Sequence, residues 1–106
     1  MSDVRYGELQ SLISELIVQM QSYDIWAACA PSANALQSDQ PFYVDTLSFE
    51  QWLQFVMVPT FTQMIEQGIP LPNVCDISPM AQEVWKGRYS DVQNTICLID
   101  QLLTGK

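Results

Sequence analysis

The sequence contains no histidine, so it lacks the side chain that most often serves as a general base and as a metal ligand. Lys and Arg together number only 4, against 12 Asp and Glu, which gives a formal net charge of −8. Proteins that bind nucleic acids or anionic membranes unaided use clustered Lys and Arg for that contact. We therefore expect no direct nucleic-acid or membrane partner, and we predict no metal, no cofactor and no catalytic residue.

Cysteines are also few, and their spacing shows no pairing. The odd count of three (Cys29, Cys75 and Cys97) fits reduced thiols. No apolar run approaches the roughly 20 residues needed to cross a bilayer, and no basic-plus-apolar leader precedes the first predicted helix. These features predict a cytoplasmic protein, and a length of 106 residues with 48% hydrophobic content suits one domain over residues 1–106.

The clearest helix signal begins at Ser48. Ser48 is a favoured N-cap, and Gln51 three residues later completes a capping box. The apolar spacing continues to Gly68, a natural residue in the position after a helix, and Pro70 prevents further extension. We therefore predict a second helix from Ser48 to Gly68.

Pro59 lies inside this predicted helix. A proline there removes the backbone bond to Phe55 and costs about 3 kcal/mol. The helix must therefore be kinked near Phe55 or broken into two pieces. We favour the kink because the apolar spacing carries through it. The kink either only wraps the helix around the core or opens an apolar pocket near the freed carbonyl.

Three other segments have helical patterns. A stripe of apolar residues with helical spacing predicts a first helix over about residues 3–23. Ser78 as N-cap, followed by Pro79, predicts a short third helix that stops near Gly87. Ser90, with Gln93 at the capping-box position, predicts the start of a fourth helix, whose apolar stripe runs from Val92 to Leu103.

The connection over residues 24–47 is too long to lack structure in a compact domain. We expect a short helical turn at 31–36 and an extended segment at 41–44. No segment shows convincing strand alternation. The prediction is an all-α, four-helix up-and-down bundle, with a long, partly ordered connection between helices 1 and 2 and a second helix kinked by proline.

Several motifs together resemble the YqcC-like family of small bacterial proteins. They are Gln40-Pro41-Phe42, Asp45-Thr46, Trp52-Leu53-Gln54, Pro59, Pro70-Leu71-Pro72 and Ser78-Pro79. The resemblance implies a four-helix bundle and brings no known activity. Some relatives are labelled tRNA pseudouridine synthase or are encoded beside one. Enzymes of that kind are similar in using a catalytic aspartate on a larger mixed α/β scaffold, so we expect no such catalysis from this chain, and an accessory role stays open.

The candidate binding residues gather around the start of the second helix. Asp45 either bonds to the backbone ahead of the helix or places a carboxylate at the mouth of an aromatic pocket. The aromatic residues nearby either belong to the core or line a groove for a partner or ligand. The candidate partner- or ligand-binding residues are Phe42, Tyr43, Asp45, Trp52, Phe55 and Pro59.

The leading functional hypothesis is a non-catalytic protein-interaction module that binds a partner, or a second copy, through an aromatic edge. An accessory role in RNA modification is compatible with it. The alternative is a small-molecule-binding protein with an apolar pocket near Pro59. A third hypothesis is an enzyme that uses Asp45 or another carboxylate.

Overall fold

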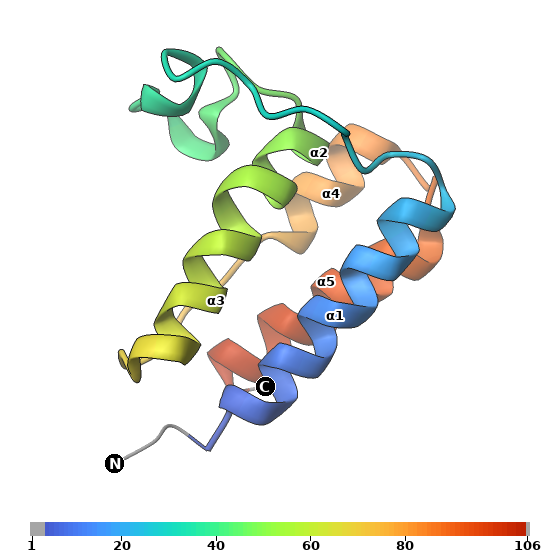
Figure 1. The fold of residues 1–106 in the computed structure, drawn as a ribbon. Coiled ribbons are helices and arrows are strands. Elements are labelled where there is room, and N and C mark those ends of the chain that lie inside the picture. The colour runs from blue at the N-terminus through green and yellow to red at the C-terminus, as the bar shows by residue number, and fades with distance from the viewer. Residues whose placement is uncertain (1–3, 106) are drawn as a thin grey trace.

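The computed structural model describes residues 4–105, without the side chain of Pro41, as a bundle of four helices (Figure 1). The first helix, α1, spans Tyr6–Ser22. The second comprises α2 (Phe49–Trp52), a π-helical segment (Leu53–Met57) and α3 (Val58–Gln67), which follow one another without a gap. The helices α4 (Ser78–Trp85) and α5 (Ser90–Thr104) complete the bundle. The predicted all-α class is confirmed, since the described residues contain no strand, whereas the up-and-down order stays a prediction.

The core lies where α1 and α4 pack on α5 and where α3 contacts α1. Two apolar stripes with helical spacing form its centre, because residues three or four apart lie on one face of a helix. The α1 stripe consists of Leu9, Ile13, Leu16 and Met20, and the α5 stripe consists of Val92, Ile96, Ile99 and Leu103. Each of these side chains is at most 4% exposed, so the stripes predicted for these helices are confirmed.

The two ends of the second helix confirm the local signals in the sequence. Ser48 Oγ accepts from the Gln51 N–H at 3.2 Å, and Gln51 Oε1 accepts from the Ser48 N–H at 2.9 Å, so the capping box is present. At the other end Gly68 adopts a left-handed conformation with φ 67°. The Ile69 N–H then reaches the Met64 carbonyl at 2.9 Å, which is the bond that defines a Schellman ending.

Pro59 is accommodated without a break. The Val58 N–H donates to the Leu53 carbonyl, five residues back, so the turn before the proline is widened into a π-helical one. Pro59 then falls in the first turn of α3. The predicted distortion therefore takes the form of a π-helical segment, and the alternative of two separate helices is wrong.

Three other helix ends differ from prediction. The first helix begins at Tyr6, while the predicted start at Asp3 lies outside the described residues. Helix α4 already includes Ser78, so Ser78 is not its N-cap and makes no capping bond. In α5 the N-cap is Tyr89, in a left-handed conformation, and the Gln93 amide donates to the Arg88 carbonyl at 2.7 Å instead of closing a capping box at Ser90.

The connection between α1 and α2 is partly ordered, as predicted. It contains two short 3₁₀ turns, Ala35–Gln37 and Pro41–Tyr43. The first agrees with the expected helical turn. The second shows that the predicted extended path at 41–44 is wrong: Phe42 and Tyr43 have left-handed backbone angles, with φ 56° and 52°.

Candidate functional site

A row of aromatic rings runs from the α1–α2 connection across α2 to the α4–α5 connection. Phe42 packs edge-on against Trp52, with ring centroids 4.8 Å apart, and Phe49 lies beside both. The ring of Phe49 in turn packs edge-on against that of Trp85, with centroids 5.1 Å apart. The ring of Trp85 packs in the same way against that of Tyr89, with centroids 5.4 Å apart. Such edge-to-face pairs each contribute about 0.5–1.5 kcal/mol beyond burial. The row therefore fixes the connection against α2 and joins it to α4.

Two of the predicted site residues, Phe42 and Trp52, meet in this row. Both are half-buried, so each leaves part of its ring at the surface. Phe42 and its neighbour Tyr43 hold left-handed backbone angles, which cost of order 1–3 kcal/mol for residues other than glycine. Strain of this kind persists where the surrounding contacts determine the conformation, and here the packing of Phe42 on Trp52 supplies such a contact.

Asp45 lies outside the aromatic row. Its carboxylate is exposed and accepts a hydrogen bond from the Ser38 hydroxyl. The next residue, Thr46, donates its hydroxyl to the Ala35 carbonyl at 2.7 Å. These two bonds tie residues 35–38 to the segment before α2. One of the two roles predicted for Asp45 is a bond to the backbone ahead of the second helix, but its hydrogen bond is to the Ser38 side chain instead.

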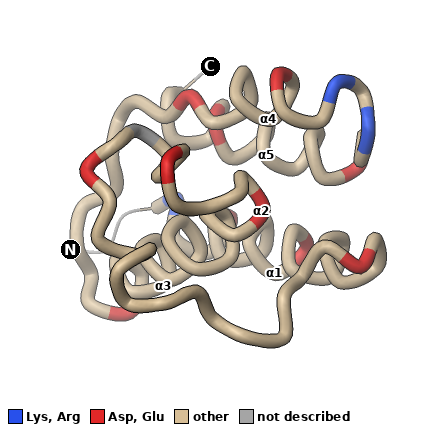
Figure 2. The backbone as a smooth tube through the Cα atoms, turned by 90° about the horizontal axis from the view of Figure 1, so that it is seen from above, with Lys and Arg blue, Asp and Glu red and all other residues tan. Residues whose placement is uncertain are grey.

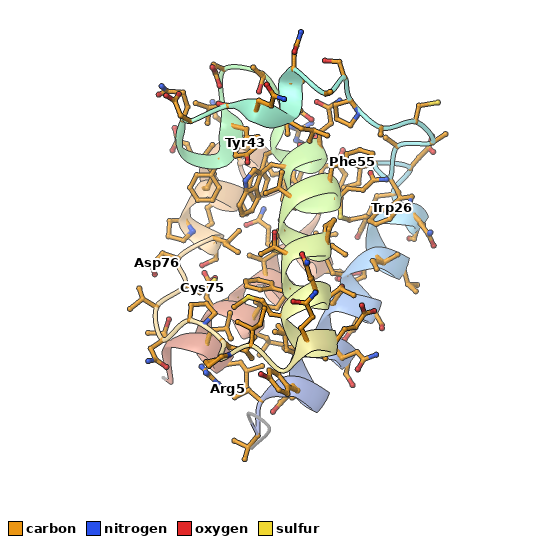
Figure 3. The ribbon with its side chains drawn as sticks, turned by 60° about the vertical axis from the view of Figure 1, so that its left-hand side comes forward. Arg5, Trp26, Tyr43, Phe55, Cys75 and Asp76 are labelled. Carbon is orange, nitrogen blue, oxygen red and sulfur yellow. The ribbon has the colours of Figure 1, made fainter. Side chains whose placement is uncertain are left out.

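Phe55 and Pro59 also lie outside the aromatic row. Phe55, in the π-helical segment, lies on the side of the second helix that faces Trp26, and Tyr43 lies on the opposite side (Figure 3). The Pro59 side chain is exposed. Pro59 lines none of the four surface hollows described within residues 4–105, so the geometry gives the pocket predicted there no support.

The largest described hollow lies beside Trp26, where the chain leaves α1. It has a volume of about 420 Å³ and is open to solvent. Residues from two segments line it: Asp24, Ile25, Trp26 and Ala27 from the connection, and Ser48, Glu50, Gln51 and Gln54 from the second helix. Sequence reasoning did not identify this hollow, because the two segments are more than twenty residues apart.

A buried glutamine holds the two walls of this hollow together. Gln54 is 8% exposed, and its side-chain amide bonds to the backbone of Ala27 twice. Its Oε1 accepts from the Ala27 N–H at 2.7 Å, and its Nε2 donates to the Ala27 carbonyl at 2.8 Å. On the same wall Glu50 Oε1 accepts from the Trp85 indole N–H at 3.0 Å. Both polar side chains therefore have structural partners.

A buried acid, Asp100, orders the start of α4. Its two carboxylate oxygens accept from the backbone N–H groups of Ile77 at 3.0 Å and Ser78 at 2.7 Å. The Asp100 carboxylate therefore supplies the cap that was predicted for the Ser78 hydroxyl. Burial, together with this carboxylate, also raises the pKa of the Cys75 thiol to about 12. A thiol with such a pKa stays protonated at neutral pH and is a poor nucleophile.

Within residues 4–105, no group of three or more Cys, Asp or Glu side chains is arranged to hold a metal ion. Over the same range, no helix has both the length and the apolar character needed to span a bilayer. The described residues thus form an all-α bundle with a partly exposed aromatic row and with its buried polar groups in structural bonds.

The sequence profile of the family described as DUF446, tRNA pseudouridine synthase C, matches residues 8–103. The chain therefore belongs to the DUF446 family. This agrees with the predicted YqcC-like membership, since the uncharacterised protein YqcC of Escherichia coli K12 is 28% identical over 57% of this chain and 55% of its own length.

Two further relatives bear on function. An uncharacterised protein of Haemophilus influenzae is 36% identical over 79% of this chain and 78% of its own length. A protein of Pectobacterium carotovorum named tRNA pseudouridine synthase C is 23% identical over 89% of this chain, but the match spans only 25% of that longer protein. No solved structure matches this chain.

Proposed function

We propose that this chain is a non-catalytic protein-interaction module that acts as an accessory to a tRNA pseudouridine synthase. One observation carries the proposal. The chain matches a quarter of the Pectobacterium protein that bears the synthase name, and three quarters of that protein have no counterpart here. The Haemophilus relative is matched over 78% of its own length, so in that bacterium the module is not a small part of such a longer chain. A module that is part of a longer chain in one bacterium and separate in another commonly meets the rest of that chain as a partner in the second case.

The charge of the chain supports a protein partner over direct contact with tRNA. An enzyme that modifies tRNA has to contact phosphates, and proteins do this with Lys and Arg. The present chain has a net charge of −8 and would be repelled by the same phosphates. A basic surface on the synthase would instead attract it, and complementary charge mainly accelerates association and makes it sensitive to salt.

The surface that we assign to this contact is the edge formed by Phe42, Tyr43, Asp45 and Trp52. Half-buried aromatic rings are frequent anchors in protein interfaces, because they bury a large area at a small entropic cost. Phe42 and Trp52 are already held by their mutual packing, so little ordering is needed when a partner covers them. Asp45 is exposed and lies outside the aromatic row, three positions after Phe42 in sequence, and we assign it to the rim of this surface as a negative charge.

The test is a calorimetric titration of this chain against purified tRNA pseudouridine synthase C from the organism that encodes this chain. We expect a one-to-one complex that weakens as salt rises from 50 to 300 mM. The Phe42→Ala variant should bind at least tenfold more weakly. Val74→Ala is the matched control, because Val74 is an apolar side chain 70% exposed on another part of the surface. Absence of binding at 100 µM synthase in low salt would refute the proposal.

A further inference from the structure

A second surface feature lies between α1 and α3, away from the aromatic row. It is a groove of about 240 Å³, and its apolar lining, which we call its floor, consists of Ile13, Ile17 and Ile65. Four polar residues also line it: Gln10, Ser14, Thr62 and Glu66. Ile13 is buried, while Ile17 and Ile65 are half-buried, so part of their apolar surface is left to solvent. The groove exists because α1 packs mainly along α5 and has a smaller contact with α3.

The charge around this groove has one sign. The sequence of α1 (Tyr6–Ser22) contains no Lys or Arg, and neither does the second helix from Phe49 to Gln67. All charged residues on these helices are glutamates: Glu8, Glu15, Glu50 and Glu66. Two of the four basic residues, Lys86 and Arg88, lie on the α4–α5 connection (Figure 2).

Arg5, the basic residue nearest to α1 in sequence, is directed elsewhere. Its guanidinium donates to the carbonyls of Leu71, Pro72 and Leu103, in the connector before α4 and at the end of α5. The groove is therefore an apolar strip between two helices that carry only negative charges. A ligand that fits it has apolar groups for the floor and positive charges for the surroundings.

We propose that this groove binds an amphipathic helix of a partner protein, with Leu, Ile or Met on one face and Lys or Arg beside that face. Helices commonly dock in grooves between two helices through apolar residues spaced by three and four positions. The α1 residues that line the groove run from Gln10 to Ile17, a length of about 10 Å at 1.5 Å per residue, which matches about two turns of such a helix. A second copy of this chain is a poor occupant, because two chains with net charge −8 repel each other.

The test uses a defined probe: a fluorescein-labelled 14-residue peptide of Leu and Lys, with Leu at helical spacing. Fluorescence anisotropy measures its binding to the full chain and to three variants. Ile17→Gln and Ile65→Gln each remove apolar floor without changing the net charge, and both should weaken binding at least tenfold. Val18→Gln is the control. Val18 is next to Ile17 on α1 but is 64% exposed and is not part of the groove, so binding should change less than twofold.

A second peptide of the same composition, with its Leu residues scrambled, separates docking from simple charge attraction. We expect it to bind at least tenfold more weakly than the ordered peptide. Equal binding of the two peptides would overturn the proposal, as would equal losses in the Ile17→Gln and Val18→Gln variants. Circular dichroism identifies any variant that fails to fold.

NMR chemical-shift changes in the unmodified chain give a test that needs no variant. On addition of the ordered peptide, the largest changes should fall on α1 and α3, and changes confined to other elements would overturn the proposal. Sedimentation of the chain alone at 200 µM should show a monomer, and a dimer abolished by Ile17→Gln would assign the groove to a second copy instead. No synthase is present in these experiments, so their outcome is independent of the function proposed above.

Discussion

Replacement of Asp100 by alanine should destabilise the protein more than replacement of any exposed acid. Asp100 is 7% exposed, and its carboxylate accepts the N–H groups of Ile77 and Ser78 at the start of α4. Alanine leaves both donors without this acceptor. Each buried donor left unsatisfied costs about 1–3 kcal/mol, so we expect a loss of about 2–6 kcal/mol in the free energy of unfolding. Because domains have total stabilities of about 5–15 kcal/mol, a loss in the lower half of this range leaves the variant folded at 10 °C.

The assay is urea unfolding followed by circular dichroism at 222 nm, with linear extrapolation to zero urea. Asp91→Ala is the matched control, because Asp91 is an exposed acid on the same helix. Removal of the Asp91 carboxylate should lower the free energy of unfolding by about 1 kcal/mol or less, which is the usual size of the interaction between an exposed acid and the helix dipole. Hydrogen exchange provides a local measurement: the amides of Ile77 and Ser78 should exchange much faster in Asp100→Ala. A loss below 1 kcal/mol, with unchanged exchange at both amides, would refute the capping role of Asp100.

The structure supports four further predictions. Gln54→Leu removes both hydrogen bonds to the Ala27 backbone, so it should lower the free energy of unfolding by about 1–3 kcal/mol and accelerate proteolysis within residues 24–40. An unchanged cleavage rate would contradict the role of Gln54 as a clamp between the second helix and Ala27. Arg5→Met removes the donor to three backbone carbonyls and should cost about 1–3 kcal/mol in urea unfolding, whereas a cost below 0.5 kcal/mol would show that these bonds add no stability. Iodoacetamide at pH 8 should label the exposed Cys29 first and Cys75 last, and early labelling of Cys75 would contradict its burial. Because the pKa of Cys75 is raised from 9.0 to about 12, the native state keeps a proton that the unfolded chain loses. The contribution of this thiol to stability is therefore complete below pH 9 and falls as the pH rises toward 12, so Cys75→Ala should show a smaller decline between pH 8 and 11.

Features decided by neighbouring residues could be predicted from the sequence. The capping box at Ser48 needs only Gln51, three positions away, and the Schellman ending at Gly68 needs only the last turn of its helix. The apolar stripes of the first and last helices could also be predicted, because residues with helical spacing share the face of the helix that becomes buried. These local rules were enough for the fold class and for the starts of the second, third and fourth helices to within one residue.

Features that depend on residues far apart in sequence could not be predicted. Ser78 was expected to cap its own helix, but the cap comes from Asp100, 22 positions later, and no local pattern indicates this. The clamp between Gln54 and Ala27 spans 27 positions and defines the largest described hollow. At Ser90 the local pattern was misleading, because Tyr89 turns into a left-handed conformation and becomes the N-cap.

The candidate site was predicted in part. The pairing of Phe42 with Trp52 agrees with the expected aromatic edge. Its continuation through Phe49 to Trp85 was not expected, because it depends on how α4 packs against α2. Phe55 and Pro59 were included because they are close to Trp52 in sequence, but Phe55 lies on the side of the second helix that faces Trp26, and the Pro59 side chain is exposed.

The most direct test of the proposed non-catalytic role is pseudouridine formation in unmodified tRNA, measured by nucleoside mass spectrometry. Three reactions are compared: the purified chain alone, tRNA pseudouridine synthase C alone, and the two together. We expect no pseudouridine above background with the chain alone, and a change in the rate or in the salt tolerance of the synthase when the chain is added. Pseudouridine formation by the purified chain alone would contradict the non-catalytic role.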